Sequence, residues 1–526
     1  MEKKKNLFYV KGEPFIALAG EAHNSSSSTA YFMESVWEKA QEQGMNTLLL
    51  PVTWELVEPV EGTFDFATQD AIIAQARERG MHIIFLWFGS WKNAQCMYAP
   101  NWVKTDLERF PRAQVEKGQN KCQLKDFYGM PYTTLSYLGE ETNKADARAF
   151  AEFMKHLKEI DEAEQTVIAV QVENETGMQG AGREHSDLAD ELFAGGVPAD
   201  FAAYMRSHTD EMAEDVKAAV EQGKDGKTWE EVFGDVAEEI FSAYHVASYV
   251  NRVAEAGKAV YDLPMTANCW LDKGEKPGKY PSGGPVARVM EVWKFAAPAI
   301  DIIAPDIYVQ NFCEICDAYT KMGNPLFIPE TATHSHVGPR LVYTVGHHHA
   351  ICFAPFGFED MGQEFSGTQS YLFGVDTSDP LLQTPQDVDE YRWYNQTIAS
   401  MTPMLADAYG TNRLQAVITE VPDKNMMMFG SYGFMVLFDL PLISRKDGVC
   451  LALQESEDTF YLIANACMLA PISTNPEKPN VDLLAVEEGY FEDGKWVMTR
   501  RLNGDETASM NFGEPTLLKI KLFSYK

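Results

Sequence analysis

The sequence predicts an α/β fold: a closed (β/α)8 TIM barrel followed by an all-β, sandwich-like C-terminal domain. Eight apolar segments of strand length recur in the first 408 residues, and amphipathic helical patterns separate them. Alternating strands and helices build parallel sheets, and eight such units are enough to close a barrel. After residue 408 the pattern changes to short alternating strands. We therefore expect a barrel over residues 1–408 and a β domain over 409–526.

The eight expected strands are apolar runs of the kind that a parallel sheet buries on both faces. Helical patterns follow the first two at residues 31–44 and 65–80; Phe32, Val36 and Ala40 share a face in the first, and Gly44 and Gly80 end the two patterns. A doubly wound open sheet is the alternative, but it normally carries a Gly-rich phosphate loop after its first strand, where this chain has GEAHNSSSS. The serines there fit N-capping of the first helix better than a nucleophile. The expected strands are 15–21, 46–54, 82–91, 167–175, 264–270, 300–308, 325–330 and 350–359.

Two insertions, at about 92–145 and 176–263, follow the third and fourth strands. Loops at the carboxyl ends of barrel strands surround the mouth where ligands bind, so we expect both insertions to form walls of a site. The C-terminal domain contains six alternating segments, between residues 415 and 525, and a sandwich is the natural architecture for them.

Composition limits the partners. The chain has 44 basic and 77 acidic residues, a formal net charge of −33, which disfavours nucleic acid and anionic membrane surfaces and favours a neutral substrate. We recognise no signal peptide and no apolar run long enough to span a membrane, so we expect a cytoplasmic location. The eight cysteines resemble reduced core thiols more than a disulfide framework. A homo-oligomer is possible.

Two carboxylates stand in matching contexts. Glu175 closes the apolar run VIAVQVENE, and Glu330 closes the run PLFIPE. Strand tips on one barrel mouth can converge, and glycosidic bond cleavage needs one carboxylic acid to protonate the leaving oxygen and another to attack carbon or activate water. A purely structural role, in which each acid caps a following helix, is the alternative for either residue alone. The pair together favours a catalytic site.

Further candidates surround this pair. The amide of Asn174 would face the same space, and Tyr308 would hold Glu330 ionised and oriented. Glu21 would bind sugar hydroxyls or pair with a buried Lys or Arg. Tryptophans near the strand ends fit a sugar site because aromatic rings pack on the apolar faces of pyranoses, although each one could instead be core. The expected substrate-binding residues are Asn174, Tyr308, Glu21, His23, Asn24, Trp54, Trp91, Trp270 and His334; Trp87 also lies near a strand end.

No metal or cofactor is predicted. His347, His348 and His349 are adjacent in sequence and are expected to end a helix, since three neighbouring side chains do not face one point on a regular backbone. Cys313 and Cys316 form a lone CxxC without the second pair that a zinc site would need.

Several segments resemble glycoside hydrolases. PVTWELVEPVEGTFDF resembles the segment after the second barrel strand in families 35 and 42, and QVENETG closely resembles the family 35 acid/base motif; LWFGSWKNA and GEAHNSSSS resemble a divergent bacterial branch of family 35 that carries a β-rich C-terminal domain. The resemblance implies a clan A barrel, a retaining mechanism and β-galactosides as substrates. It also implies that Glu175 is the acid/base, Asn174 contacts the 2-hydroxyl and Glu330 is the nucleophile. Thr176 stands where the family usually has Tyr, and Gly20 to Asn24 replace its usual first-strand pattern.

The expected function is therefore a retaining, exo-acting O-glycosyl hydrolase, of β-galactosidase type, acting on a neutral oligosaccharide or glycoside. Two alternatives remain open. One is a retaining β-glycosidase for glucosides, mannosides or arabinosides, and the other is a catalytically silent carbohydrate-binding barrel. A barrel metallohydrolase ranks below them, because the first strand does not end in HxH.

Overall fold

The computed structural model describes residues 7–118, 124–125, 129–223, 227–364, 384–441, 443–508 and 510–526. Its central feature is a parallel sheet in the order β11-β13-β3-β4-β5-β8-β9-β10-β12. Each expected strand is present, usually one to three residues shorter than the apolar run. The bounds are β3 Ala17–Glu21, β4 Thr47–Thr53, β5 His82–Phe88, β8 Val167–Val172, β9 Met265–Trp270, β10 Ile302–Ile307, β11 Phe327–Ile328, β12 Glu330–Thr331 and β13 Cys352–Phe353.

The sheet closes through a single segment. Phe327 and Ile328 pair with β13, whereas Glu330 and Thr331 pair with β10 on the other side. Pro329 lies between the two halves, and because proline has no N–H it interrupts the ladder there. β11 and β12 are thus two halves of one strand, and the eight strands form a closed barrel. This confirms the predicted fold class.

Side chains alternate between two cores along the barrel strands. Leu49, Ile84 and Leu86 belong to a small core cluster inside the barrel, whereas Leu48 and Ile83 belong to the large cluster shared with the helices. Successive residues of a strand point to opposite faces, so a barrel strand must be apolar on both. This explains why the strands read as continuous apolar runs in the sequence.

The first barrel helix differs from the prediction in two details. In α1 (Ala30–Glu42), Met33 and Trp37 are buried together with Val36 and Ala40, while Phe32 is 53% exposed. The helix begins after Thr29, whose side chain accepts a hydrogen bond from the N–H of Phe32, so a threonine and not a serine is the N-cap. The preceding serines form a short 3-10 turn instead. The buried face of the helix includes Met33 rather than its neighbour Phe32, so the prediction that Phe32 lies on this face was wrong.

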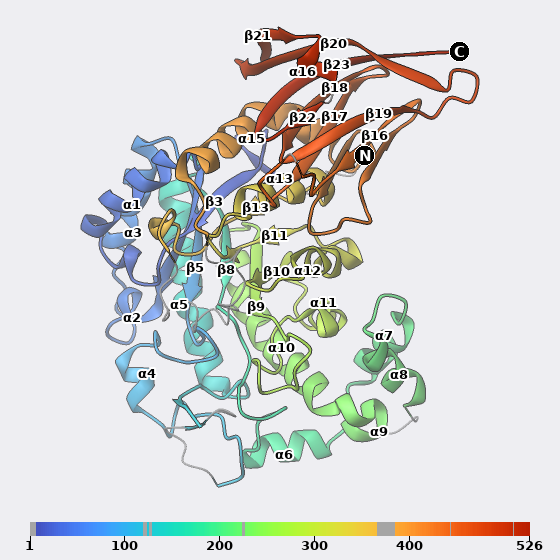
Figure 1. Cartoon of the computed structure of the whole chain (residues 1–526). Coiled ribbons are helices and arrows are strands. Elements are labelled where there is room, and N and C mark those ends of the chain that lie inside the picture. The colour runs from blue at the N-terminus through green and yellow to red at the C-terminus, as the bar shows by residue number, and fades with distance from the viewer. Residues whose placement is uncertain are drawn as a thin grey trace.

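Most other barrel helices cover the outside of the sheet, and the insertions add helices beyond β5 and β8. In Figure 1 the insertion helices α4 and α6 to α9 lie at the lower end of the molecule, and the C-terminal strands lie at the upper end. The helices are α2 Trp54–Val57, α3 Ala67–Glu78, α4 Asn101–Thr105, α5 Glu140–Asp161, α6 Asp187–Ala194, α7 Ala199–Ser207, α8 Glu214–Gln222, α9 Trp229–Phe233, α10 Ala237–Lys258, α11 Met290–Ala296, α12 Phe312–Tyr319, α13 Val337–His347 and α15 Val388–Ala408.

The C-terminal region contains two antiparallel sheets. Their facing side chains form a separate core cluster, which confirms the prediction of an all-β, sandwich-like C-terminal region. The other face of the larger sheet contacts α13 through β14 and β17. The larger sheet has the order β14 (Leu414–Ile418), β17 (Val449–Ser456), β18 (Thr459–Asn465), β23 (Thr516–Tyr525), β20 (Asn480–Glu492) and β21 (Lys495–Leu502), and the smaller has β15 (Met426–Phe429), β16 (Tyr432–Leu437), β19 (Cys467–Ser473) and β22 (Asn511–Phe512). Small elements complete the fold: β1 Phe8–Val10, β2 Glu13–Phe15, β6 Leu124–Lys125, β7 Pro131–Tyr132 and α16 Asp505–Ala508.

Two expectations about the whole chain are tested only in the described part. None of the helices there has the length and apolar character needed to cross a bilayer. The seven cysteines in these residues are all buried and free of disulfides. The boundary at 408/409 remains a prediction, although α15 ends at Ala408 and β14 begins at Leu414.

Candidate active site

Glu175 projects from a strained turn rather than from a strand. β8 ends at Val172, and the backbone then takes left-handed conformations at Glu173 (φ 64°) and Glu175 (φ 45°). The turn is held from two sides: the C=O of Glu175 accepts a hydrogen bond from the N–H of Ala94 at 3.0 Å, and its N–H donates to Oδ1 of Asn268 at 3.0 Å. A left-handed non-glycine residue costs about 1–2 kcal/mol. Such strain persists where the surroundings fix it, often at functional sites.

Glu330 begins β12 directly opposite Asp306 of β10. The hydroxyl of Tyr308 donates a hydrogen bond to Oε2 of Glu330 at 2.8 Å. One carboxylate oxygen from each of Glu175, Asp306 and Glu330 lies within 4.8 Å of the other two. The structure therefore brings the two sequence-predicted acids together, with Tyr308 on one of them and a third acid between their strands.

The acids are almost completely enclosed. Glu175 is 6% exposed and Glu330 is 5% exposed. Burial, and then the negative charge of Glu330, raise the pKa of Glu175 to about 8. Burial and the charge of Glu330 also raise the pKa of Asp306, and that of Glu21, well above their usual range. At neutral pH this favours a protonated Glu175, as a general acid requires.

One buried cation faces these acids. Lys92 follows β5 and is 6% exposed. Burial alone would lower the pKa of its ammonium group, but the nearby carboxylates, Glu330 foremost and then Glu175 and Glu21, raise it. Three clustered carboxylates could in principle hold a divalent metal ion. Here the charged ammonium of Lys92 supplies positive charge to the same cluster.

The site has hydrogen-bonding capacity that the described residues do not use. Neither side-chain atom of Asn174 has a partner there, although the residue is fully buried. Oε2 of Glu175 and Oε1 of Glu330 are also without hydrogen bonds in this part of the chain. Buried polar atoms are normally paired, so a group of unpaired ones at one place indicates that a polar ligand binds there.

Three residues of this site, Lys92, Asn268 and Asp306, were not predicted from the sequence. Lys92 lies one residue past the expected third strand, and Asp306 lies inside the expected sixth strand. Asn268 connects Asp306 to Glu175: its amide N–H donates to Oδ2 of Asp306 at 2.8 Å, and its carbonyl oxygen accepts from the N–H of Glu175. The rule that found Glu175, a polar residue at the carboxyl end of an apolar strand, applies equally to Lys92 and Asp306.

Glu173 and Asp146 form a second pair of buried acids. Both residues are fully buried, and burial, followed by the negative charge of Asp146, raises the pKa of Glu173 well above its usual range. Oε2 of Glu173 accepts from the N–H of Trp91 at 2.8 Å. Asp146 accepts from the indole of Trp87 and from the hydroxyl of Ser90. This pair connects the turn that bears Glu175 to the segment after β5.

The predicted aromatic residues divide into two groups. Trp54 and Trp91 are buried, and their indole N–H groups donate to Glu58 and to the C=O of Gly177. Both therefore have core contacts and offer little surface to a ligand. Trp270 is only partly buried and lies opposite Asp306 in the sheet register, so it is the predicted tryptophan best placed to contact a ligand.

The remaining predicted substrate-binding residues differ in the residues that they contact. Glu21 ends β3, and the charges of Glu330 and Lys92 both act on its pKa. It therefore belongs to the acid cluster. Lys92 is also a buried lysine near Glu21, as the alternative role of Glu21 required. The ring of His23 instead bonds to Asp360 at 2.9 Å, and Oδ1 of Asn24 has no partner in the described residues. His334 is buried in another network, where its ring contacts Arg340 at 3.3 Å. Its substrate role stays a prediction.

Comparison with known families finds matches at two parts of the chain. The description "Glycosyl hydrolases family 35" belongs to the family whose model matches residues 7–113, which include β3, β4 and β5. The resemblance to family 35 is confirmed. Residues 392–513 match a second model, described as a domain of unknown function (DUF5597), which covers most of the C-terminal sheets. The family 35 match supports the prediction of an O-glycosyl hydrolase. The description of the C-terminal match names no function.

Individual relatives are distant or short matches. A β-galactosidase from Xanthomonas manihotis is 34% identical over 80 residues, which are 15% of this chain and 13% of that protein. Among solved structures, a β-galactosidase from Rahnella sp. R3 is 14% identical with a TM-score of 0.47, covering 77% of this chain and 58% of the other. An exo-β-1,4-mannosidase from Opitutaceae bacterium strain TAV5 is 13% identical with a TM-score of 0.43, covering 77% and 63%.

Proposed function

We propose that this protein is a retaining, exo-acting glycoside hydrolase that removes terminal β-galactosyl residues from a neutral oligosaccharide or glycoside. The observation that carries the proposal is the position of Glu175 and Glu330, with carboxylate oxygens within 4.8 Å of each other at the carboxyl ends of β8 and β11–β12. Retaining enzymes hold their two carboxyl groups about 5–5.5 Å apart, whereas inverting enzymes leave about 6.5–9.5 Å for a water molecule. The short separation favours retention.

Glu330 acts as the nucleophile. The hydroxyl of Tyr308 stabilises the negative charge on Oε2, and Oε1 has no partner among the described residues and is therefore free to attack the anomeric carbon. The buried ammonium of Lys92 lies near this carboxylate, whose negative charge raises the pKa of the lysine. Attack forms a covalent glycosyl-enzyme ester, and the bond to the leaving group breaks in the same step.

Glu175 acts first as the acid and then as the base. With a pKa of about 8 it is protonated at neutral pH, and it gives its proton to the glycosidic oxygen as the leaving group departs. The ionised Glu175 then removes a proton from water, which hydrolyses the ester and restores both groups. Asn174, with its unused amide, would hold a sugar hydroxyl beside them.

Exo action is supported by the enclosure of the acids, since an open groove that admits the middle of a polysaccharide would leave them more exposed. Galactose is supported by the family 35 match and by the named relative from Xanthomonas manihotis. A retaining β-glycosidase for another sugar uses the same carboxylates and is the second candidate.

The test is hydrolysis of aryl β-galactoside beside the aryl β-glucoside, β-mannoside and α-arabinoside, with proton NMR following the first-formed product. We expect the highest kcat/KM on the galactoside and a β-configured sugar as the first product. A first product of α configuration would overturn retention, and a higher kcat/KM on another sugar would overturn the galactoside assignment. Micromolar binding of sugar without turnover would support a silent binding barrel instead.

A further inference from the structure

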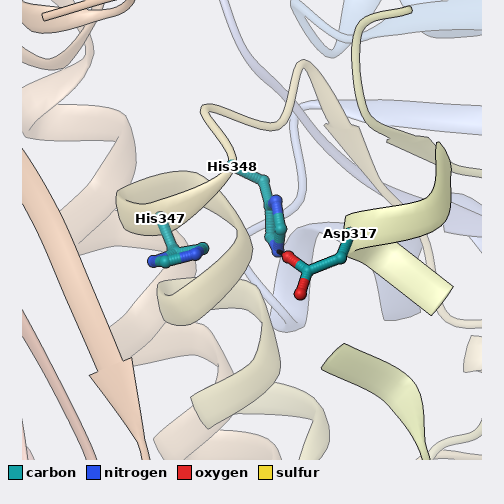
Figure 2. Close-up of side chains that lie close together, drawn as sticks. All are labelled: Asp317, His347 and His348. Carbon is teal, nitrogen blue, oxygen red and sulfur yellow. Dashed lines mark ion pairs between the residues drawn. The ribbon is translucent and has the colours of Figure 1, made fainter. Parts of the chain in front are cut away.

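A second cluster of chemically active side chains lies outside the proposed active site, on helices α12 and α13. Asp317 comes from α12, and His347 and His348 come from the end of α13. One ligand atom of each residue lies within 4.8 Å of those of the other two. Figure 2 shows the imidazole of His348 directed at the carboxylate of Asp317, with His347 beside it at the helix end. We propose that Asp317, His347 and His348 bind one divalent transition-metal ion, of which Zn²⁺ is the natural occupant.

The distance between the side chains of His348 and Asp317 fits a shared metal ion better than a direct hydrogen bond. Nε2 of His348 lies 3.6 Å from Oδ1 of Asp317, beyond hydrogen-bond range. Two ligands of a tetrahedral zinc ion, each bonded at about 2.1 Å, lie about 3.4 Å apart. A metal ion between these atoms would therefore need only a small adjustment of the two side chains.

His348 provides independent evidence for a missing partner. Its side chain is only 5% exposed, and Nε2 makes no hydrogen bond in the described part of the chain. A buried imidazole nitrogen that is aimed at a carboxylate without bonding to it loses the stabilisation that a partner would give. A metal ion would satisfy both groups.

His347 is oriented as metal-binding histidines usually are. Its ring hydrogen-bonds to the C=O of Ala416 in β14 and stacks on Tyr343, with ring centroids 4.9 Å apart. Metal-bound histidines commonly use their second ring nitrogen in this way, which fixes the tautomer and the ring orientation. The two histidine rings are 4.7 Å apart and nearly perpendicular. The sequence predicts no metal here, because neighbouring side chains do not face one point on a regular backbone; α13 ends at His347, however, so His348 already follows the last helical residue.

Access and selectivity follow from the surroundings. His347 lines a cavity of about 520 Å³ between α13 and the start of the C-terminal domain, which gives an ion a route to the site. Two imidazoles and one carboxylate suit Zn²⁺, Ni²⁺ or Cu²⁺ rather than Mg²⁺ or Ca²⁺. The ion would cross-link α12 to α13, the helices that follow β10 and β12, and so act on stability at a place that the proposed catalysis does not use.

The ammonium group of Lys424 competes with a metal ion for the carboxylate of Asp317. Its Nζ lies 3.5 Å from Oδ2 of Asp317, and its side chain is 59% exposed. A bound dication would repel this ammonium group, which is free to move into solvent. Removing Lys424 should therefore strengthen metal binding, an effect that non-specific binding to surface histidines would not produce.

The test is calorimetric titration of the full chain, without a histidine tag and after chelator treatment, with ZnCl2. We expect one Zn²⁺ per chain and a rise in melting temperature on binding. The variants Asp317→Asn, His347→Asn and His348→Asn should each weaken binding at least about 10-fold. Lys424→Ala should tighten it severalfold.

His349→Asn is the matched control. His349 belongs to the same histidine run, but its ring stacks on Tyr409 and Nδ1 accepts a hydrogen bond from Gly410. This variant should bind zinc like the wild type. Zinc binding that persists unchanged in the three ligand variants, or that is lost equally in His349→Asn, overturns the proposal. Asp317 is exposed, so Asp317→Asn tests the site even if the His348 variant does not fold.

Discussion

Glu173 and Glu175 lie two residues apart in one strained turn, and both are buried with raised pKa values. Their surroundings are different. Oε2 of Glu173 accepts a hydrogen bond from the N–H of Trp91, whereas one carboxylate oxygen of Glu175 lies within 4.8 Å of those of Glu330 and Asp306; each glutamate keeps one oxygen without a hydrogen bond within the described residues. A raised pKa alone therefore does not identify a catalytic acid. The distinguishing property is the position beside Glu330, and we therefore assign the proton-transfer role to Glu175 and a positioning role to Glu173.

The largest expected effect is that of Glu330→Ala. Removing the proposed nucleophile should lower kcat/KM by at least about 10⁴-fold, because the covalent intermediate forms on this carboxylate. Activity on an aryl β-galactoside measures the loss, and circular dichroism verifies that the variant is folded. Activity within 10-fold of the wild type would remove Glu330 from the mechanism.

The next effect separates Glu175 from Glu173. Glu175→Gln should lower turnover of alkyl or sugar β-galactosides by about 10²–10⁴-fold, and that of activated aryl substrates much less in the glycosylation step, since good leaving groups need no proton. Glu173→Gln should cost less than about 10-fold on both substrates, because a glutamine reproduces the shape and neutral charge of the protonated acid. Equal losses in the two variants would break the distinction between the glutamates.

The pH dependence should follow Glu175. The acid form is required, so kcat/KM should fall as the pH rises through about 8. Lys92 lowers the pKa of Glu175, and its removal in Lys92→Met should move this alkaline limb to higher pH while reducing kcat. A pH–rate profile of each protein measures both changes. An alkaline limb that stays in place, or moves to lower pH, would show that Lys92 does not act on the catalytic acid.

The smallest expected effect concerns the structural pair. A Cβ at Gly89 would lie 2.6 Å from Oδ1 of Asp146 and 2.7 Å from Oε1 of Glu173. Gly89→Ala should therefore lower the free energy of unfolding by about 1–3 kcal/mol, measured by urea denaturation. The pH limb of Glu175 should stay near 8 in the folded variant. An unchanged free energy of unfolding would mean that this pair tolerates displacement.

The sequence predicted the barrel because its evidence is repeated. Eight apolar runs, each buried on both faces, leave a strong signal, and two of them end on Glu175 and Glu330. Tyr308 was found by the same reasoning, and the structure places it on Glu330.

The remaining site residues were beyond this reasoning for physical reasons. The left-handed turn at Glu173 and Glu175 is fixed by contacts with Ala94 and Asn268, which are distant in sequence, and no periodicity reports it. The buried charge of Lys92 is tolerated only because four acids from other strands meet there, a fact of tertiary structure. Tryptophans were over-interpreted for the opposite reason: a strand-end position does not tell a ligand platform from a core residue such as Trp54.

The most direct test of the central claim, that Glu330 attacks and Glu175 carries the proton, is the anomeric configuration of the azide product. Glu330→Ala and Glu175→Ala would each be incubated with an activated aryl β-galactoside and sodium azide, and the products identified by proton NMR. We predict an α-galactosyl azide from Glu330→Ala, where azide replaces the missing nucleophile, and a β-galactosyl azide from Glu175→Ala, where azide attacks the glycosyl-enzyme. The reverse pattern, or no azide product from either variant, would contradict the assignment.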